Sequence, residues 1–558
     1  MSENETKRRA CPRDTTKMKQ KTKARPSTVV VEQGEPLENS IIWSWMRNYY
    51  SEGGVSVWND GDVPFHITNT PLLAREWVRS VLALIRDFAR QDLIFAEEPI
   101  EVFEIGPGTG RHAFFLWQEI GRLRPLTEAL FGKPLQIRLH LAELGRSGLD
   151  SLVDHPNLRQ PLETGDIVLH QFDIETDSRP TLYHPSHSSL SLPSKNPVFI
   201  IANYILDSLS HDVLKVEDGE LFRGLTKLSV KGLKNGVDPI KMKDLGERIK
   251  LTFEYGKESV TYAEPLWNAV AEHYRRLRGE TYIPFPTSSM RLAQRSREWS
   301  ESATCFLVAD KSFTALEQMI ELEEPELVPH GGGFSFNANL HAFGIMAREL
   351  GGHAYHTSTR DGTMELSHVV FPSPGKKTDF EIAEMRYRCL DLDAFNAIDR
   401  FRVKESVDEQ VSKCKLRLCL DLLRLTGFDP QVFYELSDDI LAGLLEEHED
   451  YDEMEDELIR SLPRCLDLIY PLSDDVDVAF EIGRVAYRLD RYVEAHRAFL
   501  LSIDHYGEDP RTRFNLGLCW YYRDQFEKAR AEFELALEQD SEYQDARTWI
   551  AKCNKRTR

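Results

Sequence analysis

The chain has 558 residues, 41% of them hydrophobic and 10% aromatic, which is enough for roughly three or four domains with ordinary cores. Its formal net charge of −22 disfavours broad affinity for nucleic acid or anionic membranes, and it favours proteins or small molecules as partners. The eight cysteines form no C-x-x-C pair, and no apolar run approaches the roughly 20 residues of a membrane-spanning helix. We therefore expect reduced thiols and a cytoplasmic protein without a membrane segment.

Residues 1–35 form a basic, polar tail with few apolar side chains, which we expect to be disordered. Nucleic-acid contact or targeting is compatible with such a tail, although a solvated extension is the favoured interpretation. From Ile41 the composition becomes globular and rich in tryptophan and tyrosine. The segment 51–71, which also contains glycine and proline, is predicted to be a loop that caps a ligand pocket.

A buried strand, a glycine turn and a helix are predicted around Glu104. The turn contains Gly106, Gly108 and Gly110, and a dinucleotide fingerprint would require another glycine where the chain has Arg111. The pattern E-x-G-x-G-x-G instead favours S-adenosylmethionine (SAM). We expect the three glycines to lie against its methionine and ribose, with Glu104 orienting its amino group. An ordinary strand-to-helix turn is the alternative.

Two carboxylates follow the next predicted strands. Glu143 ends the second strand, where an acidic side chain can accept both ribose hydroxyls of a nucleoside, and a surface carboxylate is the alternative. Asp173 follows the third strand and is assigned to the adenine amine. His184 and His187 in the loop beyond have no carboxylate or cysteine placed beside them, so we predict no metal site.

The most apolar strand, 197–203, brings three polar side chains to the carboxyl edge of the predicted sheet. Ligands bind at that edge in open α/β sheets. We expect Asn203, Tyr204 and Asp207 to face the transferred methyl group, where they position an acceptor or remove its proton. Hydrogen bonding to the following turn is the alternative for Asn203. His341, at the start of a later helix, is a further candidate base.

These elements predict a Rossmann-like α/β domain over residues 36–375, with an insertion or cap at about 210–300. A helical connector is expected over 376–473 and a helical repeat domain over 474–558. Within the repeats, residues of the same kind recur at a constant offset: Gly483 and Gly517, Tyr487 and Tyr521, Ala495 and Ala529, Phe499 and Phe533. This offset is the period of tetratricopeptide repeats. Such repeats mostly bind peptides or proteins, and a structural or dimerising role is the alternative.

Several segments, in this order, resemble one known family: Tyr49-Tyr50 with residues 61–71, the glycine turn, residues 202–209, and residues 334–343. The chain is similar over about residues 45–370 to the MidA-like class I methyltransferases, the family that includes the mitochondrial complex I assembly arginine methyltransferase. That family usually has an acidic residue where this chain has Tyr204, and Asp-Tyr-Gly where it has Asp310-Lys311-Ser312. The resemblance therefore implies SAM binding more strongly than it implies arginine as the acceptor.

Taken together, the residues predict a SAM-dependent methyltransferase whose repeat module recruits a protein substrate. The alternative is a non-catalytic scaffold that retains the SAM-binding fold and associates with proteins through its repeats. The acceptor, the partner of the repeats and the oligomeric state stay open at this stage.

Overall fold

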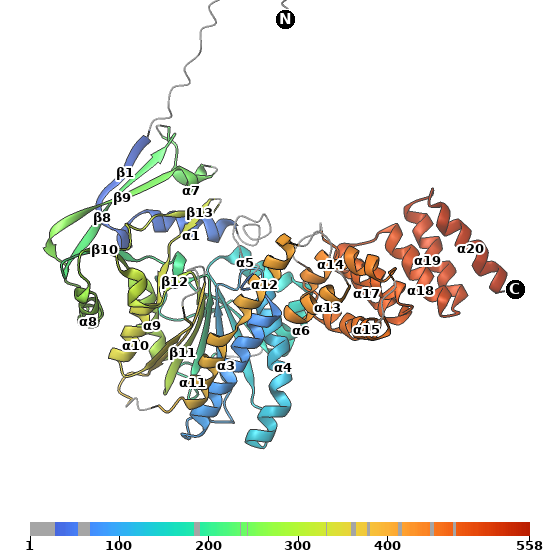
Figure 1. Cartoon of the computed structure of the whole chain (residues 1–558), viewed down its shortest axis with the longest axis horizontal. Helices are drawn as coiled ribbons and strands as arrows, with labels where there is room; N and C mark the ends of the chain where they lie inside the picture. The colour runs from blue at the N-terminus through green and yellow to red at the C-terminus, as the bar shows by residue number, and fades with distance from the viewer. Residues whose placement is uncertain are drawn as a thin grey trace, which may run out of the picture.

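The computed structural model describes residues 28–53, 67–183, 190–234, 236–242, 244–330, 332–358, 364–376, 380–410, 416–446, 451–471 and 476–557. Most of the predicted capping loop, residues 54–66, lies outside these ranges, as do His184, His187 and the first 27 residues. An α/β part occupies one end of the molecule, and helices extend from it toward the C-terminus (Figure 1). None of the helices in the described ranges is both long and apolar enough to cross a membrane.

The main sheet is mixed, with a parallel centre. Among the described residues its eight strands lie in the order β16 (His353–His356), β17 (Glu365–Pro372), β11 (Ala303–Asp310), β6 (Val198–Asn203), β2 (Ile100–Ile105), β3 (Ile137–Glu143), β4 (Ile167–Gln171) and β5 (Thr181–Leu182). β11, β6, β2, β3 and β4 are parallel, whereas β17 is antiparallel to β11. The chain order reverses between β2 and β6, which creates the switch point where open α/β sheets bind ligands.

Helices cover both faces of this sheet, so β2 and β11 are buried along their whole length and β6 up to Ala202. Val102 and its neighbours on one face pack with α3 (Pro71–Ala89), α4 (Arg111–Phe131), α5 (Arg146–Asp154) and α6 (Pro156–Thr164). Phe103 on the other face packs with α8 (Pro265–Glu272), α9 (Thr287–Ser296) and α10 (Leu340–Glu349). The strand, glycine turn and helix predicted around Glu104 correspond to β2, the turn after it and α4.

A second sheet occupies much of the segment predicted as an insertion. Its strands are β7 (Asp212–Glu217), β8 (Glu220–Lys231), β9 (Ile249–Ser259), β10 (Glu280–Phe285) and β1 (Thr28–Pro36), next to the short α7 (Leu245–Arg248). β1 corrects the prediction of disorder up to residue 35, because residues 28–35 pair with β8 through an antiparallel ladder. Backbone hydrogen bonds stabilise this strand although it is only partly buried. Its three successive valines at 29–31 are the β-branched signal that the charged composition obscured.

Two short strand pairs lie near the carboxyl ends of the parallel strands of the main sheet. They are β12 (Ser312–Phe313) with β15 (Ala338–Asn339), and β13 (Val328–His330) with β14 (Gly333–Ser335). Helix α1 (Ile42–Gly53) follows β1 and packs against β14 and α5. These elements complete the α/β part around the carboxyl ends of the parallel strands.

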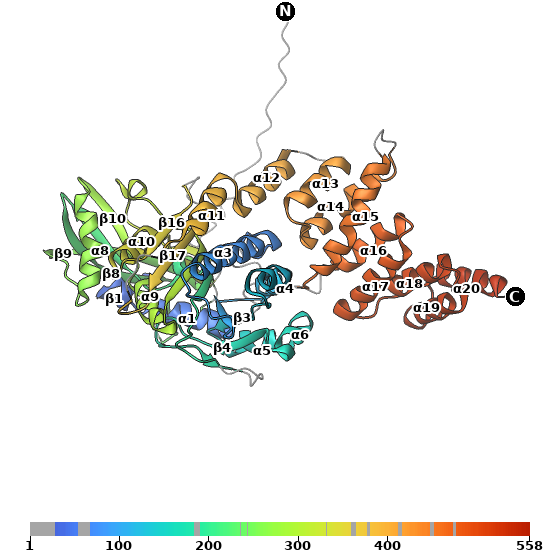
Figure 2. The same cartoon turned by 90° about the horizontal axis from the view of Figure 1, so that it is seen from below.

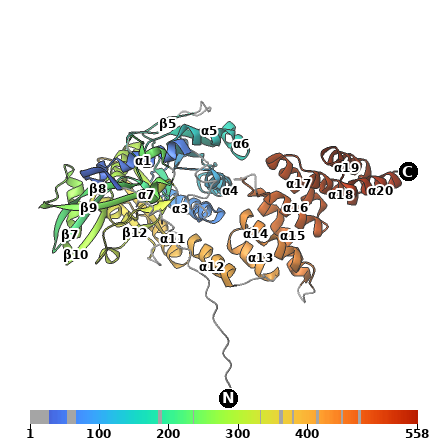
Figure 3. The ribbon, with the colours of Figure 1, turned by 90° about the horizontal axis from the view of Figure 1, so that it is seen from above.

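The C-terminal part is helical. α11 (Ala383–Ala394) and α12 (Ala397–Gln410) run beside α3 and lead to the remaining helices, as Figures 2 and 3 show. Those are α13 (Leu416–Leu425), α14 (Pro430–Gly443), α15 (Tyr451–Asp467), α16 (Val478–Arg488), α17 (Tyr492–Tyr506), α18 (Pro510–Tyr522), α19 (Phe526–Gln539) and α20 (Gln544–Arg556). A Cβ added at Gly483 would overlap Phe499, and one added at Gly517 would overlap Phe533. The positions that repeat in the sequence therefore make the same close helix contact twice.

Candidate functional site

A cavity of about 120 Å³ lies at the carboxyl edge of the parallel strands. Four residues singled out from the sequence line it, namely Gly106, Glu143, Asp173 and Tyr204. They follow or end β2, β3, β4 and β6, respectively. They meet because parallel strands end at the same edge of a sheet.

The strand ladder continues up to the cavity and fixes these positions. The N–H of Gly106 donates to the carbonyl of Ala142 over 2.9 Å, and the N–H of Phe172 donates to the carbonyl of Glu143 over 2.9 Å. The turn after β2 and the tips of β3 and β4 are thus aligned by backbone hydrogen bonds rather than by flexible side chains.

The Glu143 carboxylate is held by backbone donors. Its Oε1 accepts from the N–H of Leu144 over 2.8 Å and from the N–H of Gly145 over 3.4 Å. Burial raises the pKa of Glu143, while hydrogen bonds from the N–H groups of Gly145, Leu144 and Gly108 oppose this rise. The side chain is therefore a fixed acceptor that faces the cavity and bridges the glycine turn to β3.

Glu104 belongs to a buried polar cluster beside the glycine turn. Its Oε1 lies 2.7 Å from Nδ1 of His112, which is 3.5 Å from Nδ2 of Asn203. The indole N–H of Trp77 donates to Oδ1 of Asn203 over 3.1 Å. Glu104 Oε2 and His112 Nε2 are buried and have no hydrogen-bond partner among the described residues. Asn203 thus contacts α3 and α4 and does not line the cavity, whereas Glu104 retains one acceptor oxygen for a further donor.

Two buried carboxyl groups, those of Asp207 and Asp310, lie close to Tyr204. Asp310 Oδ2 accepts from the N–H groups of Leu206 and Asp207, over 2.8 and 3.3 Å. Burial raises the pKa of Asp207 to about 6, although the Ser208 hydroxyl and the Lys311 ammonium lower it. Burial and the neighbouring Asp207 charge raise the pKa of Asp310 well above its usual range. The pair can therefore hold a proton near neutral pH.

Tyr204 connects the cavity to this acidic pair. Its backbone has φ of 54°, a left-handed conformation that is uncommon for a tyrosine, and its N–H donates to the carbonyl of Ala309 over 2.9 Å. The ammonium of Lys311 lies 5.9 Å from the centre of the ring. Strained conformations of this kind persist where surrounding contacts enforce them and are common at functional sites.

Helix α1 covers the cavity, which the sequence interpretation missed. One face of this helix contributes four lining residues at helical spacing: Trp43, Met46, Arg47 and Tyr50. Arg47 forms an ion pair with Glu175, whose N–H donates to Oδ1 of Asp173 over 2.9 Å. Burial and the charge of Asp207 raise the pKa of Tyr50, which is hydrogen-bonded to Ser208. The helical spacing of these four residues is the signal in the sequence, whereas the prediction of a pocket cap was made for the loop 51–71.

Two glycines of the turn are surrounded by the chain itself. A Cβ at Gly106, where φ is 65°, would overlap the side chain of Ile205. A Cβ at Gly110, where φ is 78°, would lie 2.5 Å from a methyl of Leu152 and 2.9 Å from the hydroxyl of Tyr470. Gly106 lines the cavity together with Ile205, whereas Gly110 does not line it and is required there by packing.

His341 lies apart from the cavity. Its Nδ1 is 3.1 Å from the hydroxyl of Tyr274, and burial together with the charges of Arg348 and His273 lowers the pKa of His341 to about 4. It is not among the residues that line the cavity. Asp207 does not line the cavity either, but the hydroxyl of Ser208, which does, donates to Oδ1 of Asp207 over 2.9 Å. Asp207 is therefore the nearer of the two candidate bases.

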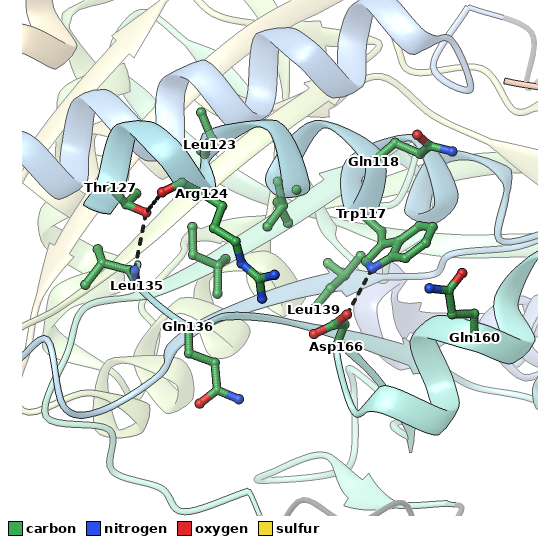
Figure 4. A pocket seen from close by; sticks show the side chains of 13 residues that line it. Trp117, Gln118, Leu123, Arg124, Thr127, Leu135, Gln136, Leu139, Gln160 and Asp166 are labelled. Carbon is green, nitrogen blue, oxygen red and sulfur yellow. Dashed lines mark hydrogen bonds between the residues drawn. The ribbon is translucent and has the colours of Figure 1, made fainter. Parts of the chain in front are cut away.

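A separate cavity of about 360 Å³ lies at the amino ends of β3 and β4. Figure 4 shows the indole of Trp117 donating to Asp166 over 3.3 Å, with Arg124 and Gln136 nearby. None of the sequence-predicted site residues lines it. Within the described ranges no cluster of three His, Cys, Asp or Glu side chains is placed to hold a metal ion.

No protein-family model and no curated protein matches this sequence. Among solved structures, a protein from Burkholderia thailandensis described as a likely methyl transferase bound to S-adenosylhomocysteine matches with 12% identity and a TM-score of 0.37, over 62% of this chain and 90% of that one. An uncharacterised protein from the same organism matches with 11% identity, a TM-score of 0.37 and the same coverage of 62% and 90%. Phosphoethanolamine N-methyltransferase 1 of Haemonchus contortus, solved with phosphoethanolamine and S-adenosylhomocysteine, matches with 8% identity and a TM-score of 0.25, over 66% of this chain and 57% of that one. Because these TM-scores are low, we base the function on the residues of this chain.

Proposed function

We propose that this protein is a SAM-dependent methyltransferase. The proposal rests mainly on one observation: consecutive parallel strands bring Gly106, Glu143 and Asp173 to a single cavity. An adenosine-containing cofactor suits this arrangement. Gly106 allows a close approach to the backbone, Glu143 is a carboxylate for the ribose, and Asp173 is a carboxylate for the adenine amine.

The residues around the turn fit the remainder of such a cofactor. Glu104 has a buried carboxylate oxygen without a partner among the described residues, which suits an ammonium group that would donate to it. Gly106 and Gly108 have no Cβ to keep a ligand away from the backbone. When bound, SAM supplies an electrophilic methyl group on its sulfonium.

The chain contributes mainly positioning and proton transfer. Tyr204 at the cavity wall orients the acceptor. Asp207 takes up the proton through Ser208, which lines the cavity and donates to this carboxylate, and burial raises the pKa of Asp207 to about 6. Asn203 supports the turn from behind through His112. Helix α1 excludes water from the cavity through Trp43 and Tyr50.

We further propose that the C-terminal helices are tetratricopeptide repeats that recruit a protein substrate. The matching contacts of Gly483 with Phe499 and of Gly517 with Phe533 support a repeated helix pair. Stacked pairs of this kind present an extended surface that suits a peptide or protein.

The second candidate function is a non-catalytic scaffold, and the size of the cavity favours it. Ligand pockets usually enclose about 300 Å³ or more, whereas this cavity encloses about 120 Å³ and Ile205 covers Gly106. For catalysis, Ile205 and α1 would have to move to admit a complete cofactor. In a scaffold, the α/β fold would be retained without catalysis, and the protein would act by associating with other proteins through its repeats.

Calorimetry with SAM tests the cofactor, with NADH as a comparison ligand. Glu143→Ala should weaken SAM binding roughly tenfold or more, because a hydrogen bond to a charged group contributes about 1.5–3 kcal/mol. Glu163→Ala, which removes an exposed carboxylate on α6, is the matched control and should bind like the wild type. No detectable heat with millimolar SAM would exclude the proposal.

Incubation with methyl-labelled SAM and a cell lysate separates enzyme from scaffold. A methyltransferase labels an acceptor, and Asp207→Asn should reduce that labelling. A scaffold labels nothing even where it binds SAM.

A further inference from the structure

Residues 467–471 begin at the last residue of α15 and lie against α4, the first turn of α6 and His155, which precedes α6. We call this segment the strap. The amide of Gln118 donates to the carbonyl of Asp467 over 3.0 Å, and the amide of Asn157 donates to the carbonyl of Ile469 over 2.8 Å. Nε2 of His155 lies 3.2 Å from the carbonyl of Pro471. The strap is therefore fixed to the α/β part by backbone contacts along most of its length.

Tyr470 places the strap directly against the glycine turn. Its hydroxyl donates to the carbonyl of Thr109 over 2.7 Å, and the side chain is buried. Its ring stacks on His155, with 3.8 Å between ring centres and 3° between planes. Gly110 allows this approach, because a Cβ there would lie 2.9 Å from the tyrosine oxygen.

A second contact from the helical region holds Arg111, the residue that directly follows the glycine turn. Arg111, the first residue of α4, donates through Nη2 to Oδ1 of Asp429 over 2.8 Å, and both side chains are almost completely buried. Thr109, Gly110 and Arg111 are thus each in contact with residues more than three hundred positions later in the chain.

We propose that Tyr470 is a positioning residue for cofactor binding, which rests on the proposed methyltransferase function. The carbonyl of Thr109 and the backbone of Gly110 are held in the conformation that presents the turn to the cavity. A loop that is ordered before the ligand arrives loses less conformational entropy on binding. The helical region would accordingly support the glycine turn of the cofactor site without lining the cavity.

The test uses Tyr470→Phe in the full chain. Phenylalanine keeps the ring on His155 and the packing beside Gly110, and it removes only the hydroxyl bonded to Thr109. Affinity for SAM, measured by calorimetry, should fall by at most about fivefold, because the loss of this hydrogen bond lowers affinity only as far as the free turn must then be ordered on binding. Amide hydrogen exchange over residues 106–112 of the ligand-free protein should become faster, while the circular dichroism spectrum is unchanged.

Tyr492→Phe is the matched control. It also removes a tyrosine hydroxyl that donates a hydrogen bond, here to Oδ1 of Asp490 over 2.6 Å, and its ring packs with Tyr487 and Tyr522. It should change neither SAM affinity nor exchange at residues 106–112. Unchanged exchange over 106–112 in Tyr470→Phe would overturn the inference, as would faster exchange spread evenly over the α/β part. If the wild type fails to bind SAM, the methyltransferase proposal fails, and exchange in the ligand-free protein still decides whether Tyr470 orders the turn.

Discussion

The contact between the α/β and helical parts should be sensitive to the loss of either partner of the buried ion pair between Arg111 and Asp429. Each side chain retains only 7% of its exposure. Asp429 also caps α14 by accepting from the N–H of Gln431 over 2.9 Å. Asp429→Asn keeps an oxygen for this cap and removes the negative charge, so it isolates the electrostatic contribution.

Removal of one partner of a buried ion pair typically costs about 3–5 kcal/mol, because the other charge stays buried without compensation. The Nε of Arg111 already has no hydrogen-bond partner among the described residues. Other protein groups can therefore do little to compensate the guanidinium charge once the charge of Asp429 is removed. Since asparagine can still accept from Arg111, we expect a loss of about 3 kcal/mol. With a urea dependence of about 3 kcal/mol per molar, the unfolding midpoint should fall by about 1 M.

The assay is urea unfolding of the full chain, followed by tryptophan fluorescence and circular dichroism. Arg111→Met with Asp429→Asn is the control, because replacement of both charges by groups of similar volume is often nearly neutral. The double variant should recover to within about 1 kcal/mol of the wild type. A wild-type midpoint for Asp429→Asn, or a double variant as unstable as the sum of the single ones, would refute the reasoning.

Three further outcomes are expected. Gly517→Ala should destabilise the C-terminal helices by about 1–3 kcal/mol, measured by thermal unfolding, because the methyl overlaps Phe533, whereas Gly256→Ala, which has open space around it, should be nearly neutral. Burial raises the pKa of Asp207 to about 6, so its contribution to stability is present at acidic pH and lost as pH rises through about 6. The melting temperature of the wild type relative to Asp207→Asn should accordingly fall between pH 4 and pH 7, and a constant difference would argue against the shifted pKa. Ile205→Ala should open the cavity and leave SAM affinity equal or higher by calorimetry, and a loss of binding would show that Ile205 contacts the cofactor instead of obstructing it.

Much of the local structure around the site was predictable from the sequence. A short apolar run before three glycines predicts a strand and a turn, and the apolar periodicity after them predicts the helix, as β2 and α4 confirm. Glu143 and Asp173 could be assigned to one edge because parallel strands end together. The constant offset between Gly483 and Gly517 likewise predicted a repeated helix contact.

Other features could not be derived from local patterns. The prediction of disorder failed at residues 28–35 because pairing with β8 depends on a strand nearly two hundred residues later. Nothing near His341 in the sequence indicates that Tyr274 would be its hydrogen-bonding neighbour. The helical spacing of Trp43, Met46, Arg47 and Tyr50 indicates that they share one face of α1, but it does not indicate which surface that face covers.

The sequence by itself determined the strands, the glycine turn and the helix after it, because the periodicity of apolar residues and the conformations open to glycine depend on only a few neighbouring residues. Only the tertiary structure decided what surrounds the glycine turn. Tyr470 lies 361 positions after Thr109, and Asp429 lies 318 positions after Arg111. Contacts at such separation depend on how whole elements pack, and they leave no periodic signal in the chain.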